Sequence, residues 1–365
     1  MPTPTHARPD CTPTQVIRVR AGVIAPDAET DHVAEETPVA LEFNGISHAT
    51  MLATPADLED FAVGFSLSEG IIDSVSDVRG IDVLPQCGGI VVQLEISSAC
   101  EMRLKTRRRA MAGRTGCGLC GVETLPEVLR PVAPVTNGAP VRIGAVLAAM
   151  RDMRARQALH DITGATHAAG WAGGDGAVAL VREDVGRHNA LDKLVGALAR
   201  QAVNAADGIV VVSSRASFEM VQKTAAAGVA VLASVSAPTA LAIRLATDAN
   251  VTLLGFLRDD DAAIYAHPER ILTCTGRTTA MEILNLIRMA NRIGQFFDAM
   301  PDRAEALEGV ANHIQKFWEP RMRTELLDFL ARSPDGDAGE EQLHPLVLQA
   351  VTQHRARLTP QARVT

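Results

Sequence analysis

Aromatic residues are scarce in this sequence, at 3% of 365 residues, so its core must consist mainly of Val, Leu, Ile and Ala. It has no uninterrupted apolar run near the roughly 20 residues that a membrane-spanning helix needs. The first eleven residues contain no apolar stretch of the kind found in secretory signals. Positive charge is not in surplus either, because the net charge is -8, whereas nucleic-acid-binding proteins usually carry a basic surface. We therefore expect a cytoplasmic protein that binds neither nucleic acid nor a membrane.

Cysteines are few, and most of them are isolated. Of the six, four are scattered along the chain, at Cys11, Cys87, Cys100 and Cys274. That spacing does not make a disulfide framework for a chain of this size, which agrees with a reducing compartment.

The other two cysteines, Cys117 and Cys120, form a Cys-x-x-Cys pair among glycines, directly after a run of positive charge. Residues 103–114 hold six cations and no acid: Arg103, Lys105, Arg107, Arg108, Arg109 and Arg114. Such a run is usually a solvated face, although beside two cysteines it can also receive an anion. Nearby guanidinium groups favour the thiolate, which is the nucleophilic form of cysteine.

A Cys-x-x-Cys pair can belong to a zinc site, a redox dithiol, a structural disulfide or a persulfide carrier. Structural zinc needs four ligands, and a zinc deaminase needs His-x-Glu upstream of Pro-Cys-x-x-Cys. The only His-x-Glu, His267-Pro-Glu269, follows the cysteines, and Pro-Cys is absent. We therefore expect no catalytic zinc, and a structural disulfide does not suit a reducing compartment. The redox dithiol and the persulfide carrier both stay open on these residues alone.

The pattern along the chain predicts several parts. Asn44-Gly45 between two apolar runs indicates a hairpin, and Thr54-Pro55 predicts the cap and first turn of a helix that ends near Gly70. From residue 176 to 256, short apolar runs alternate with helical patterns, which predicts βα units and a largely parallel sheet. The expected parts are a flexible N-terminus (1–32), an α+β subdomain with the cysteine loop (33–130), an α/β domain (142–275), a helical module (281–330) and a flexible tail (331–365).

Polar loops follow three of the predicted strands, at residues 183–188, 213–217 and 257–261. Ligands of such sheets bind beyond the carboxyl ends of the strands. Arg187 and Arg215 can therefore both bind a phosphate or a carboxylate. The alternative for Arg187 is an ion pair with Glu183 or Asp184 that only closes the loop. His167 and His188 flank the same region, and either can instead be a hydrogen-bonded core histidine.

Four segments resemble the family of formate dehydrogenase accessory proteins FdhD. They are Arg107–Gly121, Thr166-His-Ala-Ala-Gly170, Glu183-Asp-Val-Gly-Arg-His-Asn-Ala-Leu-Asp-Lys-Leu194 and Ser213-Ser-Arg-Ala-Ser-Phe-Glu-Met-Val-Gln-Lys223. The resemblance extends from about Val33 to Arg270. It implies a cytidine-deaminase-like three-layer α/β domain without catalytic zinc, with a smaller N-terminal α+β subdomain.

The same resemblance implies a sulfurtransferase. Such a protein takes sulfur from a cysteine desulfurase as a persulfide. It passes the sulfur to Mo-bis(molybdopterin guanine dinucleotide) before this cofactor enters the catalytic subunit of formate dehydrogenase. By this match Cys117 carries the persulfide and Cys120 assists, and a homodimer is expected.

The family's cofactor-binding stretch falls on Phe256, Leu257, Arg258, Asp259, Asp260 and Asp261. It is acidic here, so we expect it to contact the cofactor through its backbone. The cofactor's phosphates are expected near Arg187, His188, Arg215 and His167.

The C-terminal module has a resemblance of its own. Residues 289–303 and 308–323, which include Phe-Trp-Glu-Pro-Arg-Met, are similar to the small delta subunit of NAD-dependent molybdenum formate dehydrogenase. Phe317 and Trp318 are then either the core of a helical hairpin or part of a docking surface. Two other functions stay open for the whole chain: a cofactor-binding chaperone without sulfur chemistry, and a redox dithiol protein.

Overall fold

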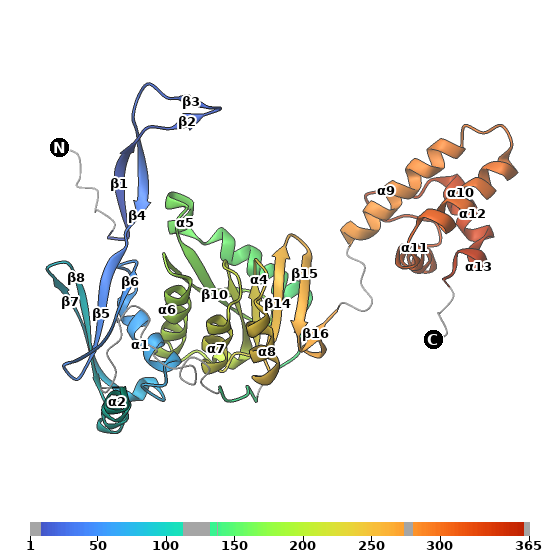
Figure 1. Ribbon diagram of the computed structural model, residues 1–365. Coiled ribbons are helices and arrows are strands. Elements are labelled where there is room, and N and C mark those ends of the chain that lie inside the picture. Colours follow the sequence, from blue (N-terminus) through green and yellow to red (C-terminus); the bar gives the residue numbers. More distant parts are fainter. Residues whose placement is uncertain (1–8, 112–131, 137, 274–279, 361–365) are drawn as a thin grey trace. The chain divides into compact units, whose positions relative to one another are not determined.

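The computed structural model describes residues 9–111, 132–136, 138–273 and 280–360 (Figure 1). The chain divides into two compact units, Met1–Thr273 and Cys274–Thr365. In the described parts of the chain, no helix is both long and apolar enough to cross a membrane.

A two-stranded antiparallel ribbon stands at the start of the first unit. Its strands are β1 (Cys11–Val16) and β4 (Glu29–Ala34). The chain between them forms a second, shorter antiparallel pair, β2 (Val19–Arg20) and β3 (Val23–Ile24). The prediction of a flexible segment over residues 1–32 is therefore wrong for the described residues 9–32. Threonine, valine and isoleucine recur in this stretch, and these β-branched residues favour strands despite the neighbouring prolines.

A four-stranded sheet follows, with the strand order β6-β5-β8-β7. Its elements are β5 (Thr37–Phe43), β6 (Ile46–Ala53), α1 (Leu58–Ser68), the 3-10 helix η1 (Val75–Asp77), β7 (Val78–Gln86), β8 (Gly89–Ile96) and α2 (Ser98–Met111). The predicted hairpin is confirmed: Asn44 and Gly45 join β5 to β6 with φ values of 49° and 76°, as a type I′ turn requires. Thr54, in contrast, does not cap α1, which begins four residues later and has Asp57 at its N-cap.

A six-stranded sheet forms the centre of the first unit, with the order β11-β10-β12-β13-β14-β15. The elements of this region are β9 (Val141–Arg142), α4 (Ile143–Ala155), α5 (Ala158–Thr163), β10 (His167–Gly173), β11 (Val178–Asp184), α6 (Arg187–Arg200), η2 (Ala205–Asp207), β12 (Gly208–Val212), α7 (Phe218–Ala226), β13 (Val231–Ser234), α8 (Ala240–Asp248), β14 (Thr252–Arg258), β15 (Asp261–Ala266), η3 (Pro268–Arg270) and β16 (Ile271–Leu272).

Helices cover both faces of this sheet (Figure 1). Successive residues of β12 point to opposite faces. Val210 and Val212 pack in one core with α6, α7 and α8, whereas Ile209 and Val211 pack in another core with α4. The predicted mixed α/β class is confirmed.

The sheet is less parallel than predicted. Only β12, β13 and β14 pair in parallel, while β10, β11 and β15 pair antiparallel to their neighbours. β10 and β11 are joined by a short turn, as are β14 and β15, and a short turn can connect only antiparallel strands. The carboxyl ends of β11, β12, β13 and β14 nevertheless lie at the same edge. β11 points the same way as β12, because both run antiparallel to β10, which lies between them.

Helices α1 and α6 hold the N-terminal sheet and the central sheet together through an unusually close contact. A Cβ atom on Gly64 would lie 1.7 Å from the backbone oxygen of Asp192, and one on Gly196 would lie 1.8 Å from that of Asp60. Only glycine at both positions permits this approach. On either side of it, Arg182 and Arg200 donate to the Asp60 carboxylate at 2.7 and 2.6 Å.

The second unit is helical. It contains α9 (Ala280–Phe297), α10 (Arg303–Phe317), α11 (Pro320–Arg332), α12 (Pro345–Gln353) and α13 (Arg355–Leu358). The prediction of a flexible tail over 331–365 is wrong for the described residues up to 360. Leu346, Val347, Ala350 and Val351 form one apolar face of α12 and are buried in the core of the unit. This helical spacing indicates a helix. The polar loop before α12 dominates the composition of residues 331–365, so the composition alone does not reveal the helix.

Candidate functional site at the carboxyl edge of the sheet

Cys117 and Cys120 lie outside the described residues, as does Arg114. The structure describes the side-chain contacts of two cations in the basic run before them. Arg103 donates to Asp73 at 2.7 Å and to the sulfur of Cys100 at 3.2 Å, and Lys105 pairs with Glu101. Each of these two charges is therefore paired with a nearby carboxylate. Asp77 also lies close to Asp73 and Cys100, and together they are the one group of potential metal ligands within the described residues.

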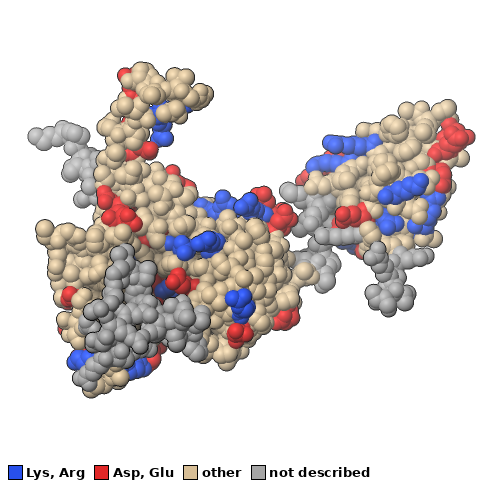
Figure 2. Space-filling view, in the orientation of Figure 1, with Lys and Arg blue, Asp and Glu red and all other residues tan. Residues whose placement is uncertain are grey.

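A polar cavity of about 450 Å³ lies at the carboxyl edge of the central sheet. Its walls come from α4, α5, the start of β10, and the segments that follow β12 and β13. The lining residues are Arg154, Gln157, His160, Asp161, Gly164, Ala165, Thr166, His167, Ser213 and Val235. Figure 2 shows basic side chains gathered along this edge between α5 and the β14–β15 turn, with acidic ones beside them. The edge therefore combines a hollow with positive charge.

Of the predicted site residues that the structure describes, His167 alone lines this cavity. Burial is the main reason that the pKa of His167 lies below its ordinary value, and the Arg187 guanidinium lowers it further. His167 is therefore a neutral imidazole near pH 7, able both to donate and to accept a hydrogen bond. The charges of His188 and Asp184 also act on it, so the first turn of α6 lies close by.

Arg187 and His188 form that first turn of α6. The alternative in which Arg187 pairs with Glu183 or Asp184 is wrong, since both carboxylates have other partners. Arg187 Nε is buried without a hydrogen-bond partner among the described residues. His188 Nε2 lies 2.5 Å from Glu219 Oε2, and this contact lowers the pKa of Glu219. An unpartnered guanidinium nitrogen beside a helix N-terminus favours an anion.

Arg215 is exposed in the loop after β12, at the same edge. Ser217, two residues later, is the N-cap residue of α7, but its side chain makes no capping hydrogen bond. Its hydroxyl is buried without a partner among the described residues.

The predicted stretch 256–261 is not a loop but the end of β14, a turn and the start of β15. Leu257 is 1% exposed and packs in the core, so its side chain cannot reach a ligand. Phe256 is partly exposed with a φ of 55°, and Asp259 has a φ of 51°. A bulky residue in the left-handed region is costly and is typical of functional segments. Arg258, Asp260 and Asp261 are exposed.

Arg151 of α4 binds the β14–β15 turn. Its guanidinium donates to Asp260 Oδ1 at 3.0 Å and to the backbone oxygen of Asp259 at 3.3 Å. Arg154, one turn further along α4 and on the same face, lines the cavity. Helix α4 thus places one cation at the β14–β15 turn and another at the cavity.

Glu183, the next-to-last residue of β11, was not predicted as a site residue except as a partner of Arg187. Its carboxylate accepts hydrogen bonds from the backbone N–H groups of Leu159 and His160, both at 2.8 Å, and from the hydroxyl of Thr166 at 3.0 Å. His160 Nδ1 lies 2.9 Å from the oxygen of Thr166. Glu183 therefore fixes the α5 wall of the cavity.

Asp184, the last residue of β11, is fully buried and has four partners. Its Oδ2 atom lies 2.7 Å from Lys193 Nζ and accepts from the N–H of Thr54 at 3.0 Å. Its Oδ1 atom accepts from the N–H of Gly186 at 2.8 Å and from the amide of Asn189 at 3.0 Å. Sequence reasoning missed this network because its members lie up to 139 residues apart.

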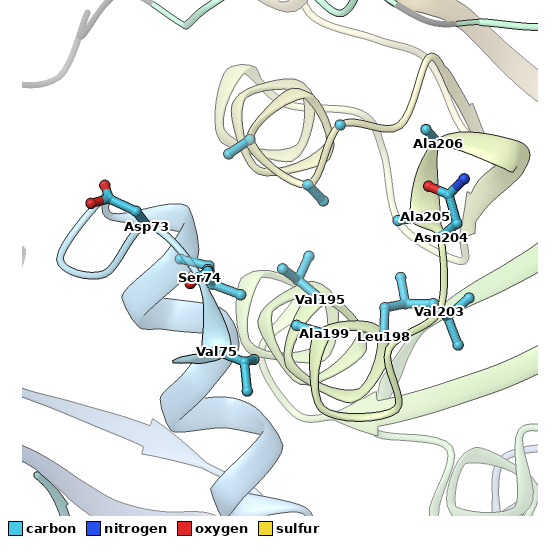
Figure 3. Close-up of a pocket in the computed structure, with 14 residues that line it drawn as sticks. Asp73, Ser74, Val75, Val195, Leu198, Ala199, Val203, Asn204, Ala205 and Ala206 are labelled. Atoms are coloured by element: carbon cyan, nitrogen blue, oxygen red, sulfur yellow. The ribbon is translucent and has the colours of Figure 1, made fainter. Parts of the chain in front are cut away.

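A second cavity, of about 460 Å³, lies at the ends of α1, α6 and α7 (Figure 3). Figure 3 shows Val195 and Leu198 of α6 pointing toward it, with Asp73 and Asn204 at its rim. Its lining, as far as the described residues provide it, contains neither a cation nor a cysteine. The carboxyl edge is therefore the better candidate for binding an anion.

The fold agrees with what comparison with known proteins shows. Residues 34–272 match the FdhD/NarQ family. The chain belongs to the FdhD/NarQ family. Among the relatives is a sulfur carrier protein FdhD from Bordetella petrii, 70% identical over 268 residues, or 73% of this chain and 96% of that protein. Another, from Cupriavidus necator, is 61% identical over 241 residues, or 66% of this chain and 84% of that protein.

The FdhD-like part also resembles a solved structure. A crystal structure of a protein assigned as a formate dehydrogenase accessory protein, from Desulfotalea psychrophila, matches with a TM-score of 0.59 at 25% identity. The match covers 72% of this chain and all of that one.

The second unit has a separate family match. Residues 285–351 match the NADH-dependent formate dehydrogenase delta subunit family, FdsD. The chain is therefore a fusion of an FdhD part with a delta-subunit-like module, as the sequence predicted.

Proposed function

We propose that this protein is a sulfur carrier, as the names of its FdhD relatives say of them, and that formate dehydrogenase activity requires it. The observation that carries the proposal is the family match over residues 34–272, with 70% identity to a named sulfur carrier. The Cys117 and Cys120 pair lies inside the matched range. We infer from the same match that the layered central sheet is cytidine-deaminase-like. A homodimer stays a prediction.

Cys117 is the proposed carrier and works by thiol exchange. Its thiolate attacks the outer sulfur of a persulfide on a cysteine desulfurase, the donor's S–S bond breaks, and the donor cysteine leaves as a thiolate. Cys117 then holds the outer sulfur as its own persulfide. Attack by the Cys120 thiolate on the inner sulfur releases the outer one as sulfide. It leaves a disulfide that a thiol must reduce before the next cycle.

The acceptor in this proposal is Mo-bis(molybdopterin guanine dinucleotide), bound as a substrate at the carboxyl edge. Support comes from the polar cavity, from the buried and unpartnered Arg187 Nε, and from exposed Arg215. Arg187 and Arg215 would bind phosphate oxygens with their planar groups. Neutral His167 would hydrogen-bond an uncharged part of the ligand. Backbone groups around Phe256 and Asp259 would contact it from the β14–β15 turn.

Labile sulfur bound to the chain tests the sulfur-carrier proposal. After incubation with a cysteine desulfurase and cysteine, the wild type is expected to hold about one cyanide-reactive sulfur per chain, and Cys117→Ala none. A matched control is Cys87→Ala, since Cys87 is an exposed free cysteine outside the motif. Equal labile sulfur in wild type and Cys117→Ala would contradict the proposal.

We propose further that the second unit docks on formate dehydrogenase. Its match to the delta subunit family supports this. Trp318 is buried in the core of the unit, as the core interpretation predicted, but Phe317 is 73% exposed. Phe296 is 70% exposed, and its ring lies edge-on to Phe297, which lies against His313, which in turn lies against Phe317. Exposed aromatic side chains in a row are typical of protein interfaces.

Substituting serine for both Phe296 and Phe317 is expected to weaken association with the dehydrogenase by about tenfold or more, because two aromatic anchors are lost. The variant should unfold at the wild-type temperature, since neither ring is buried. Co-purification of the dehydrogenase with the full chain measures the association. Exposed Met102 of the first unit provides the control, as Met102→Ser. Unchanged co-purification of the double variant would rule out this surface.

A further inference from the structure

Consecutive residues at the end of β11 hold two different walls of the candidate site. Neighbouring side chains of a strand point to opposite faces of its sheet. Glu183 bonds the backbone of α5 and the hydroxyl of Thr166, which line the cavity. Asp184 bonds the N–H of Gly186 and the side chain of Asn189, which flank Arg187 and His188. The two carboxylates therefore act on opposite sides of the same edge.

Neither α5 nor α6 has a side-chain cap from its own N-cap residue. The N-cap residues Gln157 of α5 and Gly186 of α6 provide no capping hydrogen bond. Glu183 replaces the cap of α5 by accepting from the N–H groups of its second and third residues, at a helix end that favours negative charge. Asp184 holds the backbone just before α6. The position of each first turn thus depends on a carboxylate from β11.

Asp184 also connects this edge to the N-terminal subdomain. Thr54, at the end of β6, donates its N–H to Asp184 and accepts from Lys193 Nζ at 2.9 Å through its backbone oxygen. Its hydroxyl accepts from the N–H of Val185 at 3.1 Å. The subdomain that contains Thr54 leads, through α2, into the chain segment with Cys117. One buried carboxylate therefore links the part of the chain before the cysteines to the anion-binding edge.

We propose that Glu183 and Asp184 are the positioning residues of this site. Glu183 sets the place of His160 and Thr166, and Asp184 sets the place of Arg187 and His188. This inference rests on the proposed function for the identity of the ligand, but its geometric part does not.

The chain offers a matched control for Asp184. Asp192 and Lys223 form a second buried ion pair at 2.9 Å, and Asp192 precedes Lys193 on α6. Asp192 faces α1 and α7 instead, where Ser68 donates to it at 2.8 Å. Both pairs cross the same core, but only Asp184 bonds the segment that leads into Arg187 and His188.

The test compares three variants of the full chain. A single Asp184→Asn change leaves Lys193 charged and unpaired in the core and can prevent folding, so the variant is Asp184→Asn with Lys193→Met. The control is Asp192→Asn with Lys223→Met. The third variant is Glu183→Gln, which keeps the shape but exchanges an acceptor oxygen for an N–H donor.

Hydrogen exchange of backbone amides provides the first measurement. The Asp184 and Lys193 variant is expected to raise exchange over residues 185–190 by about tenfold or more, and Glu183→Gln over residues 158–163. The control is expected to lower the unfolding temperature by a similar amount without this local increase. If the control raised exchange over 185–190 as much, or if the Asp184 and Lys193 variant raised it nowhere, the proposal would be overturned.

The second measurement is the affinity for GDP, which is used as a probe for the guanine dinucleotide. Both positioning variants are expected to bind GDP about tenfold more weakly than the wild type and the control. Equal affinity in all four proteins would also overturn the proposal. If the wild type did not bind GDP, the proposed ligand would be wrong, while the exchange comparison would still decide whether these carboxylates position the edge.

Discussion

A deletion strain complemented with the Cys117→Ala variant is expected to have no more formate dehydrogenase activity than the same deletion strain with an empty vector. The reason is chemical. A persulfide needs a sulfur nucleophile, and alanine has none, so sulfur does not reach the cofactor. The substitution should not change stability or the amount of protein in the cell. Dehydrogenase activity in cell extracts, at equal amounts of enzyme, is the measurement.

The same strain separates the rival functions. A chaperone that only binds and delivers the cofactor would still support activity with Cys117→Ala. A redox dithiol protein would reduce disulfides in an insulin assay and would not bind GDP. Cys87→Ala is the control and should restore full activity, because Cys87 is exposed and lies outside the matched motifs. Activity of Cys117→Ala near the wild-type level would therefore favour the chaperone.

Alanine at Gly64 or Gly196 is expected to destabilise the first unit severely. Each new Cβ atom would lie less than 2 Å from a backbone oxygen of the facing helix. A side chain can rotate away from such a contact, but a backbone oxygen can move only with its helix. Overpacking costs about 1–3 kcal/mol in typical cores and occasionally more, and we expect the upper end here. Urea unfolding of the two variants measures the loss.

Gly144 provides the control for this experiment. It lies in the first turn of α4, is exposed, and a Cβ there would meet no atom within 4 Å. Alanine at Gly144 should therefore stabilise the protein slightly, by at most about 1 kcal/mol, because glycine is the poorer helix former. If Gly64→Ala and Gly144→Ala had the same effect on unfolding, the close contact between α1 and α6 would not exist as described.

The parts of the fold that were predicted correctly are those with a strong local pattern. The run Gly208–Val212 is apolar and rich in β-branched residues, and Val231–Ser234 is a short, fully buried run, as buried parallel strands are. The Asn44-Gly45 turn determines its hairpin. Strand β10 was missed because it consists mainly of Ala and Gly, which have little strand preference. α12 was missed because the polar loop before it dominates the composition.

The site was predicted less completely, for a different reason. The long motifs that revealed the family were expected to supply ligand-binding residues, and Arg187, His188 and Arg215 do lie at the predicted edge. Several charged members of the same motifs are instead buried supports: Asp184, Asp192, Lys193 and Lys223 pair with one another inside the core. A charge in a sequence does not show which partner will neutralise it, and those partners lie on other elements.

The central claim is that Cys117 carries sulfur, and the most direct test is to find that sulfur on the chain. The full-length protein is incubated with a cysteine desulfurase and cysteine, persulfides are labelled by alkylation, and the peptides are identified by mass spectrometry. We predict one additional sulfur on the peptide that contains Cys117, and its loss in Cys117→Ala. Absence of the label from that peptide in the wild type, or the same labelling of the chain in Cys117→Ala, would contradict the account.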